Sequence, residues 1–190
     1  MKNILVVKLS AIGDVIHALP VSYAIKERFP EAHLTWVVEK PAYPILEDNP
    51  YIDDIILFEK AKFRSVSGFL HEIGPFRRQL RARPYDASLD LQGLFKSAAI
   101  VWNAGARQRV GTANMREGAH LVSRPVRGAH AEGHIVERYL DVARALGCTV
   151  DEVRFPVAVS ERDRAAAEML LAREGVQDGR AFVAFAIGAN

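Results

Sequence analysis

A short apolar run, followed at once by a small-residue turn and a helix, stands at the start of the chain. Residues 4–7 (ILVV) are apolar and mostly β-branched, which is typical of a parallel strand buried on both faces. The run 34–38 (LTWVV) repeats this pattern after a helical segment and completes a βαβ unit. Shorter runs follow at 55–58, 87–91 and 109–111. This alternation predicts an α/β fold with a doubly wound, mostly parallel sheet.

The predicted helices lie between these runs, and their ends follow from proline and glycine. Pro30 closes the first helix, Pro84 stops the basic one, and Gly147 ends a later one. Residues 112–131 have little periodicity and predict a mobile surface loop that carries function. The expected helical ranges are 14–29, 41–47, 71–83, 94–102, 132–146 and 160–174.

The pattern restarts after Pro156. A helix is followed by a strongly apolar run at 181–187 (AFVAFAI), which predicts another buried strand. A buried parallel strand needs neighbours and cover. We therefore predict that residues 1–155 form one α/β domain and that 156–190 form a linker and the beginning of a second, incomplete one.

Composition narrows the function classes. The 190 residues contain no apolar run long enough to cross a membrane and no signal-peptide pattern. The single cysteine, Cys148, cannot form an internal disulfide and fits a reducing compartment. We therefore expect a cytoplasmic protein.

Charge is spread unevenly although the net charge is only +2. Residues 60–127 carry 13 Lys or Arg against 4 Asp or Glu, which predicts an anionic partner. A solvated basic helix at 77–83 would account for part of this excess. Nucleic acid is not favoured, because few aromatic residues interleave with the basic ones and no nucleic-acid-binding module is present.

Several common site signatures are missing. The first strand is followed by SAIGD rather than G-x-G-x-x-G, and neither a phosphate-binding P-loop nor a G-x-S-x-G elbow occurs. His130 and His134 have a spacing that metal ligands use, but no cysteine or well-placed carboxylate completes a set. We predict no metal site and no required cofactor; assistance by a divalent cation stays open but is not indicated.

Polar residues instead gather at the predicted strand ends, where open α/β sheets bind ligands. A carboxylate among cations suits a general base that acts on a hydroxyl of an anionic substrate. Asp14, close to a helix start, could equally be a helix cap, and Gly13 permits close backbone approach or a left-handed conformation. The set consists of Lys8, Ser10, Asp14, Glu39, Asp90, Gln92, Lys96, Arg116, His134, Glu137 and Arg138.

Five stretches together resemble the lipopolysaccharide heptosyltransferases. The first, 8–20 (KLSAIGDVIHALP), resembles the opening of that family. The others are 36–39 (WVVE), 90–98 (DLQGLFKSA), 116–119 (REGA) and 134–138 (HIVER), in the order of the family. The second and third stretches favour the type I enzymes over the type II enzymes.

This resemblance implies the amino-terminal half of a GT-B fold, in which two Rossmann-like domains face each other across a cleft. It implies inverting transfer of heptose from ADP-L-glycero-D-manno-heptose to a Kdo sugar of Kdo2-lipid A, at the cytoplasmic face of the inner membrane, with room for peripheral membrane contact. Asp14 matches the catalytic base. The residues implied around the acceptor or beside the sugar are Lys8, Ser10, Gly13, Arg64, Lys96, Arg116 and His134, with Ala189 and Asn190 at the edge of the nucleotide-sugar pocket.

Two other functions stay open. One is a non-catalytic module that binds an anionic glycolipid or a protein, and the other is a GT-B glycosyltransferase with a different donor. The family's ADP pocket lies mostly beyond Asn190. A polypeptide that ends there is therefore expected to bind ADP-heptose poorly and to be inactive, whereas a longer chain with this sequence is expected to be active.

Overall fold

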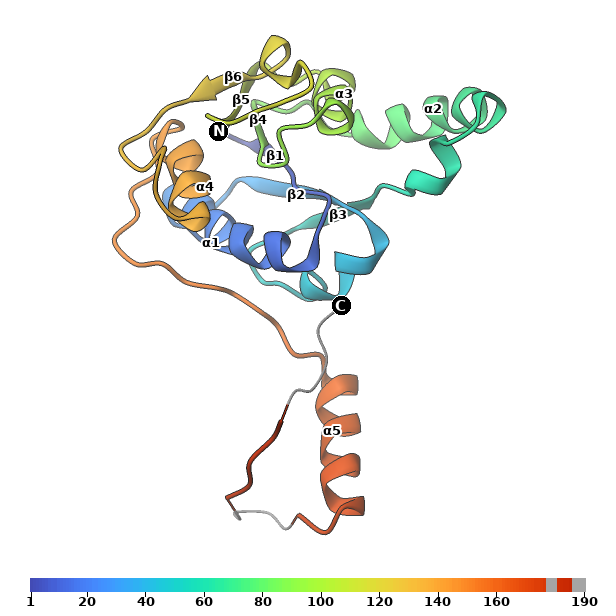
Figure 1. Ribbon diagram of the computed structural model, residues 1–190, viewed down its shortest axis with the longest axis vertical. Helices are drawn as coiled ribbons and strands as arrows, with labels where there is room; N and C mark the ends of the chain where they lie inside the picture. The colour runs from blue at the N-terminus through green and yellow to red at the C-terminus, as the bar shows by residue number, and fades with distance from the viewer. Residues whose placement is uncertain (177–180, 186–190) are drawn as a thin grey trace. The chain divides into compact units, whose positions relative to one another are not determined.

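The computed structural model describes residues 1–176 and 181–185, and the chain forms two compact units, Met1–Ala158 and Val159–Asn190. The first unit holds a six-stranded sheet, all parallel, in the order β3-β2-β1-β4-β5-β6 (Figure 1). The predicted doubly wound α/β fold is thereby confirmed. The strands are β1 (Asn3–Val7), β2 (His33–Val38), β3 (Asp54–Leu57), β4 (Ala87–Asp90), β5 (Gln108–Thr112) and β6 (Arg124–Val126).

Helices cover both faces of this sheet. The pair α1 and α4 lies on one face, and the pair α2 and α3 lies on the other (Figure 1). Among the described residues, none of the helices combines the length and the apolar character that a membrane crossing requires. The helices of this unit are α1 (Ile12–Arg28), α2 (Val66–Leu80), α3 (Phe95–Ala104) and α4 (Ile135–Arg144), with short 3-10 helices η1 (Lys40–Ile45), η2 (Lys60–Phe63) and η3 (Ala119–Leu121).

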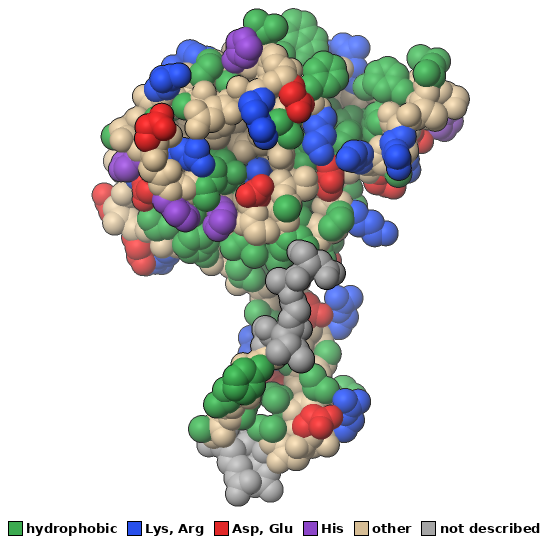
Figure 2. Space-filling view, viewed as in Figure 1, with side chains coloured by type: hydrophobic (Ala, Val, Ile, Leu, Met, Phe, Trp, Pro, Cys, Tyr) green, Lys and Arg blue, Asp and Glu red, His purple; other side chains and the backbone are tan. Residues whose placement is uncertain are grey.

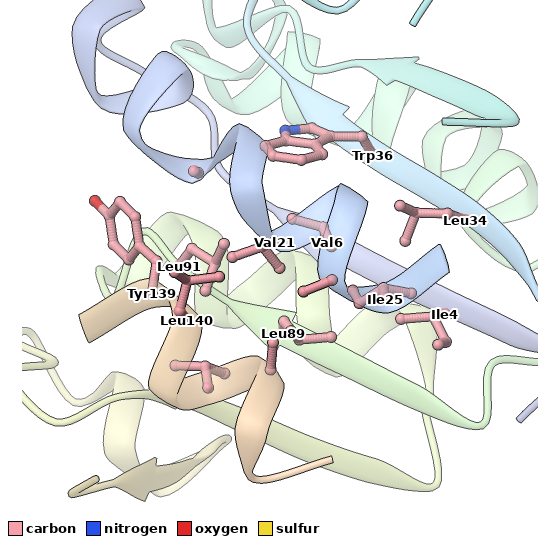
Figure 3. Packing of buried hydrophobic residues seen from close by; sticks show 14 of the residues in the cluster. Ile4, Val6, Val21, Ile25, Leu34, Trp36, Leu89, Leu91, Tyr139 and Leu140 are labelled. Atoms are coloured by element: carbon pink, nitrogen blue, oxygen red, sulfur yellow. The ribbon is translucent and has the colours of Figure 1, made fainter. Parts of the chain in front are cut away.

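The central strand β1 supplies both hydrophobic cores. Ile4 and Val6 belong to the cluster beneath α1 and α4, whereas Leu5 and Val7 belong to the cluster beneath α2 and α3. This is the period-two alternation of a strand, with both faces buried. Figure 3 shows the first cluster, where side chains of β1, β2 and β4 pack against those of α1 and α4.

The strand order reverses its direction at β1. The chain first builds outward through β2 and β3, then returns to place β4 on the other edge of β1, with Val7 beside Asp90. The carboxyl ends of β1 and β4 therefore open onto the same crevice. In doubly wound sheets, such a switch point is where ligands bind.

The segment 112–131, predicted as an irregular loop, contains regular structure. This segment contains η3 and the edge strand β6, which pairs with β5. It is also tied to the turn after β4, because the amide of Arg116 donates to the carbonyl of Gly93 over 2.8 Å and Glu117 accepts from the amide of Phe95 over 3.0 Å. The elements are three residues long, too short to produce a periodic pattern.

Helix α2 starts five residues before the predicted range 71–83. Ser65 caps it, since its hydroxyl accepts a hydrogen bond from the amide of Gly68 over 3.1 Å. Gly68 lies in the part of the helix that was not predicted, and glycine disfavours helix interiors, whereas Pro75 lies within the predicted range and the helix continues through it. The remaining predicted elements agree with the structure to within a few residues.

The second unit contains α5 (Glu161–Arg173), as predicted, with Ser160 as its N-terminal cap. The strand expected at 181–187 is not formed over 181–185, and the rest of that range lies outside the described residues. A strand requires a hydrogen-bonded neighbour, and the described part of this unit offers none. The assignment of this unit to a donor-binding domain stays a prediction.

Candidate active site

A polar pocket of about 340 Å³ lies at the switch point between β1 and β4. It is built from the turn after β1, the turn after β4, the segment after β5 and the first two turns of α4. The lining residues are Lys8, Asp14, Leu91, Gln92, Leu94, Thr112, Ala113, Asn114, Arg116, Ile135, Arg138 and Tyr139.

Lys8 and Asp14 form an ion pair on the wall of this pocket. The Lys8 ammonium lies 3.3 Å from an Asp14 carboxylate oxygen and 5.4 Å from the centre of the Tyr139 ring. Burial lowers the pKa of Lys8, while Asp14 opposes that shift. The Lys8 side chain is 3% exposed, whereas that of Asp14 is 47% exposed. The lysine therefore anchors a carboxylate that remains open to a ligand.

Asp14 is not the N-terminal cap of α1. The capping position is Ala11, which makes no side-chain capping bond, and Asp14 lies three residues later in the first turn of the helix. There the unpaired amides and the helix dipole favour an anion. The interpretation of Asp14 as only a cap is therefore wrong. The left-handed conformation considered for Gly13 is wrong as well, because Gly13 has helical geometry within α1.

The turn after β4 holds the turn after β1 in place. The side-chain oxygen of Gln92 accepts hydrogen bonds from the amides of Leu9 over 3.1 Å and Ser10 over 3.2 Å. Asp90 in turn accepts from the amides of Gln92 over 3.1 Å and Gly93 over 2.8 Å. Burial raises the pKa of Asp90, and its second carboxylate oxygen has no partner in the described structure. Hydrogen bonds therefore connect the turn after β4 to the turn after β1, which holds Lys8.

Replacing Gln92 with methionine should lower the free energy of unfolding by about 1–3 kcal/mol, because two partly buried amides lose their acceptor at nearly constant side-chain volume. Urea unfolding followed by circular dichroism measures the change. Gln92→Glu keeps an acceptor oxygen and should lose less. Equal stability of Gln92→Met and the parent chain would show that the two hydrogen bonds to Gln92 contribute nothing to the free energy of unfolding.

The other predicted site residues do not all lie in this pocket. Arg116 lines the pocket with Lys8 and Asp14. Lys96 is turned toward Glu39, with 2.7 Å between ammonium and carboxylate, and lines a separate apolar pocket together with Arg64. The predicted residues that line neither pocket are Ser10, Gly13, Glu39, Asp90, His134 and Glu137. Ala189 and Asn190 lie outside the described residues.

The two histidines considered as metal ligands face different partners. His130 contacts Asp141 over 3.0 Å and neighbours Arg144, whereas His134 caps α4 and packs edge-on against His17 with 5.7 Å between ring centres. The described part of the chain contains no cluster of three side chains suited to a metal ion.

Tyr139 is the site residue that the sequence did not reveal. Burial and, to a smaller degree, the nearby Asp14 carboxylate raise its pKa, so the phenol stays protonated and can donate a hydrogen bond. In Figure 3 its hydroxyl points away from the packed side chains of the core. Tyr139 lies four residues after Ile135, which also lines the pocket, so the two side chains share one face of the helix. This spacing was the signal that the sequence offered.

Fold and site define the chain as a Rossmann-like α/β protein with a polar pocket at its switch point. Residues 73–190, more than half of the chain, match the sequence profile described as glycosyltransferase family 9 (heptosyltransferase). The chain belongs to this family, as its sequence motifs indicated.

Curated relatives carry the same family name. The lipopolysaccharide core heptosyltransferase OpsX of Haemophilus influenzae is 28% identical over 85% of this chain and 45% of its own length. Lipopolysaccharide heptosyltransferase 1 of Escherichia coli K12 is 29% identical over 84% of this chain and 52% of its own. Lipopolysaccharide heptosyltransferase 3 of Escherichia coli is 28% identical over 71% of this chain and 40% of its own. The chain thus spans about half the length of the curated relatives it matches.

Solved structures of similar fold are also glycosyltransferases. A family 9 glycosyltransferase from Veillonella parvula superposes with a TM-score of 0.76 over 93% of this chain and 51% of its own, at 22% identity, and supports the fold. The E. coli heptosyltransferase WaaC, solved with ADP-2-deoxy-2-fluoro heptose, superposes with a TM-score of 0.69 at 30% identity, over 80% of this chain and 51% of its own.

Proposed function

We propose that the protein containing this chain transfers L-glycero-D-manno-heptose from ADP-heptose to a Kdo sugar of Kdo2-lipid A, at the cytoplasmic face of the inner membrane. In this proposal the chain supplies the acceptor side of the enzyme. The observation that carries it is the Asp14 carboxylate, half exposed and held 3.3 Å from a buried lysine at the switch point of a family 9 chain.

The arrangement suits an inverting transfer. As the acceptor hydroxyl oxygen bonds to the anomeric carbon of the heptose, the bond to the ADP phosphate oxygen breaks and ADP leaves with the electron pair. In this proposal the hydroxyl proton passes to Asp14, whose carboxylate lines the pocket and is half exposed. Lys8 orients this carboxylate.

The cations of the pocket suit an acceptor that carries carboxylates and phosphates. Arg116 and Arg138 line the same pocket as Asp14, and guanidinium groups bind such anions through paired hydrogen bonds. The basic middle of the chain, with 13 Lys or Arg against 4 Asp or Glu over residues 60–127, would raise the local concentration of an anionic acceptor.

The test requires a protein in which this chain is joined to a donor-binding domain, called the longer protein below. The mass of the acceptor is measured after incubation of this protein with ADP-heptose. Kdo2-lipid A should gain one heptose. Gain only on an acceptor that already carries heptose would contradict the proposed acceptor. Binding of Kdo2-lipid A without any transfer would favour a non-catalytic module, and transfer only from another nucleotide-sugar would favour a different donor.

Replacing Lys96 with alanine in the longer protein should raise KM for the acceptor about tenfold, equivalent to about 1.4 kcal/mol, because a charged contact is lost and the Glu39 carboxylate is left unpaired. KM for ADP-heptose should stay unchanged. Lys62→Ala removes another ion-paired lysine, the partner of Glu59, and serves as the control. A larger effect on the donor than on the acceptor would contradict the acceptor-side assignment.

A further inference from the structure

A second pocket of about 340 Å³ lies on the other side of the turn that follows β4, between η2, α2 and α3. Its wall is mainly apolar and aromatic. Phe58 and Phe63 stack with 5.1 Å between ring centres, and Phe76 packs against both. The lining residues are Phe58, Lys60, Phe63, Arg64, Phe69, Ile73, Phe76, Phe95, Lys96, Ala99, Ile100 and Asn103.

The apolar surface continues outside this pocket. Phe69 and Phe95, both in its wall, are 46% and 68% exposed, and the nearby Val66 and Leu70 on α2 are exposed as well. Figure 2 shows hydrophobic side chains over the outer part of α2 with Lys and Arg side chains beside them. Soluble domains rarely expose so many large apolar side chains together unless the surface binds something.

Positive charge stands at the rim of the same pocket. Lys60, Arg64 and Lys96 all belong to its lining. Lys96 is paired with Glu39, whereas Lys60 and Arg64 form no ion pair within residues 1–176 and 181–185. An apolar cavity with an unneutralised cationic rim is complementary to an alkyl chain that carries an anionic head.

We propose that this pocket binds one acyl chain of the acceptor glycolipid, with a phosphate of its head at Lys60 and Arg64. The proposal rests on the proposed function. The two pockets are neighbours across a short turn, since Gln92 and Leu94 line the polar one and Phe95 and Lys96 line the apolar one. A lipid-linked sugar can therefore place its head beside Asp14 while its chain lies in the apolar pocket.

The first experiment measures binding of dodecyl phosphate, below its critical micelle concentration, to the chain by isothermal titration calorimetry. The parent chain should bind it saturably, with inorganic phosphate bound far more weakly. Phe69→Ala should weaken binding about ten- to a hundredfold, as expected for one lost phenyl contact. Ala99→Phe, which fills the cavity, should abolish it.

A matched control is available. Phe155 is exposed to the same extent as Phe69, 46%, and does not line the pocket. Phe155→Ala should bind dodecyl phosphate like the parent chain. Thermal unfolding of each variant checks that the fold is kept. Equal affinity of Phe69→Ala, Ala99→Phe and the parent would overturn the proposal.

The second experiment compares acylated and fully deacylated acceptors in the longer protein. Ala99→Phe should raise KM at least about tenfold for the acylated acceptor and leave kcat and KM for the deacylated one as in the parent. Transfer to neither acceptor by the parent would overturn the proposed function itself. Transfer to both with KM unaffected by Ala99→Phe would overturn the acyl-chain proposal alone.

A bilayer is the competing occupant, since apolar helices with cationic flanks also bind membranes. Vesicles of anionic phospholipid distinguish the two. If Phe69→Ala reduces co-sedimentation with vesicles but leaves dodecyl phosphate affinity unchanged, the surface is a membrane contact and the acyl-chain proposal is wrong.

Discussion

Replacing Asp14 with asparagine in the longer protein is expected to lower kcat by about a hundred- to ten-thousandfold, the usual contribution of a general base. Asparagine matches the carboxylate in size and can still accept from Lys8, but it cannot take the proton of the attacking hydroxyl. Initial rates at saturating ADP-heptose and acceptor measure the loss.

Two controls make the result specific. Asp54 has a similar exposure, 53% against 47%, and is likewise paired with a basic side chain, His33. Asp54→Asn should keep the parent kcat. ADP affinity of Asp14→Asn should equal that of the parent, because the nucleotide is expected on the other domain. Parent-like turnover of Asp14→Asn would refute the assignment of the base.

Replacing Asp90 with alanine should lower the free energy of unfolding by about 2–4 kcal/mol, because the amides of Gln92 and Gly93 lose their acceptor within a buried turn. Asp90→Asn keeps an acceptor oxygen and should cost much less. Chemical denaturation at neutral pH compares the three proteins. Similar losses for alanine and asparagine would show that the buried charge, not the two amide contacts, sets the stability.

The pH dependence of Asp90→Asn follows from burial. Burial raises the pKa of Asp90 in the folded protein, so the folded chain holds this proton more tightly than the unfolded chain. The parent therefore loses stability as pH rises from the ordinary aspartate pKa to the raised one. The asparagine variant lacks this loss. Its stability relative to the parent should rise across that window and stay constant above it.

The sequence predicted those parts of the fold that depend on local pattern. The run 4–7 has no polar position, and it is the strand buried on both faces. The small-residue turn after it places Lys8 at a strand end and Asp14 in the first turn of a helix, which brings the two side chains together. The alternation of strands and helices predicted a doubly wound parallel sheet, and the structure adds the strand order.

The parts that escaped prediction depend on contacts between distant segments. Tyr139 reaches Lys8 only because α4 packs beside α1. The apolar pocket was not predicted because its wall includes Phe69, which lies in the start of α2 that the sequence did not indicate as helical, next to Gly68. Strand β6 has three residues, one of them proline, and is formed by pairing with β5 rather than by its own propensity.

The same limit applies to the predicted acceptor residues. Motif matches named Arg64, Lys96 and Arg116 as one set, whereas the structure places Arg116 beside Asp14 and the other two at the apolar pocket. Sequence spacing cannot distinguish the two sides of a turn. In our proposal one acceptor contacts both sets of residues: its charged sugar head lies at the polar pocket and its acyl chain lies in the apolar pocket.

The most direct test of the acceptor-side account is a heteronuclear NMR titration of the isotope-labelled chain with a soluble Kdo disaccharide. The account predicts saturable shifts of the amides around the polar pocket, at Ser10, Gln92 and Arg116, and no shifts of these amides when ADP is added instead. Shifts confined to α5, or no saturable response to the disaccharide, would contradict it.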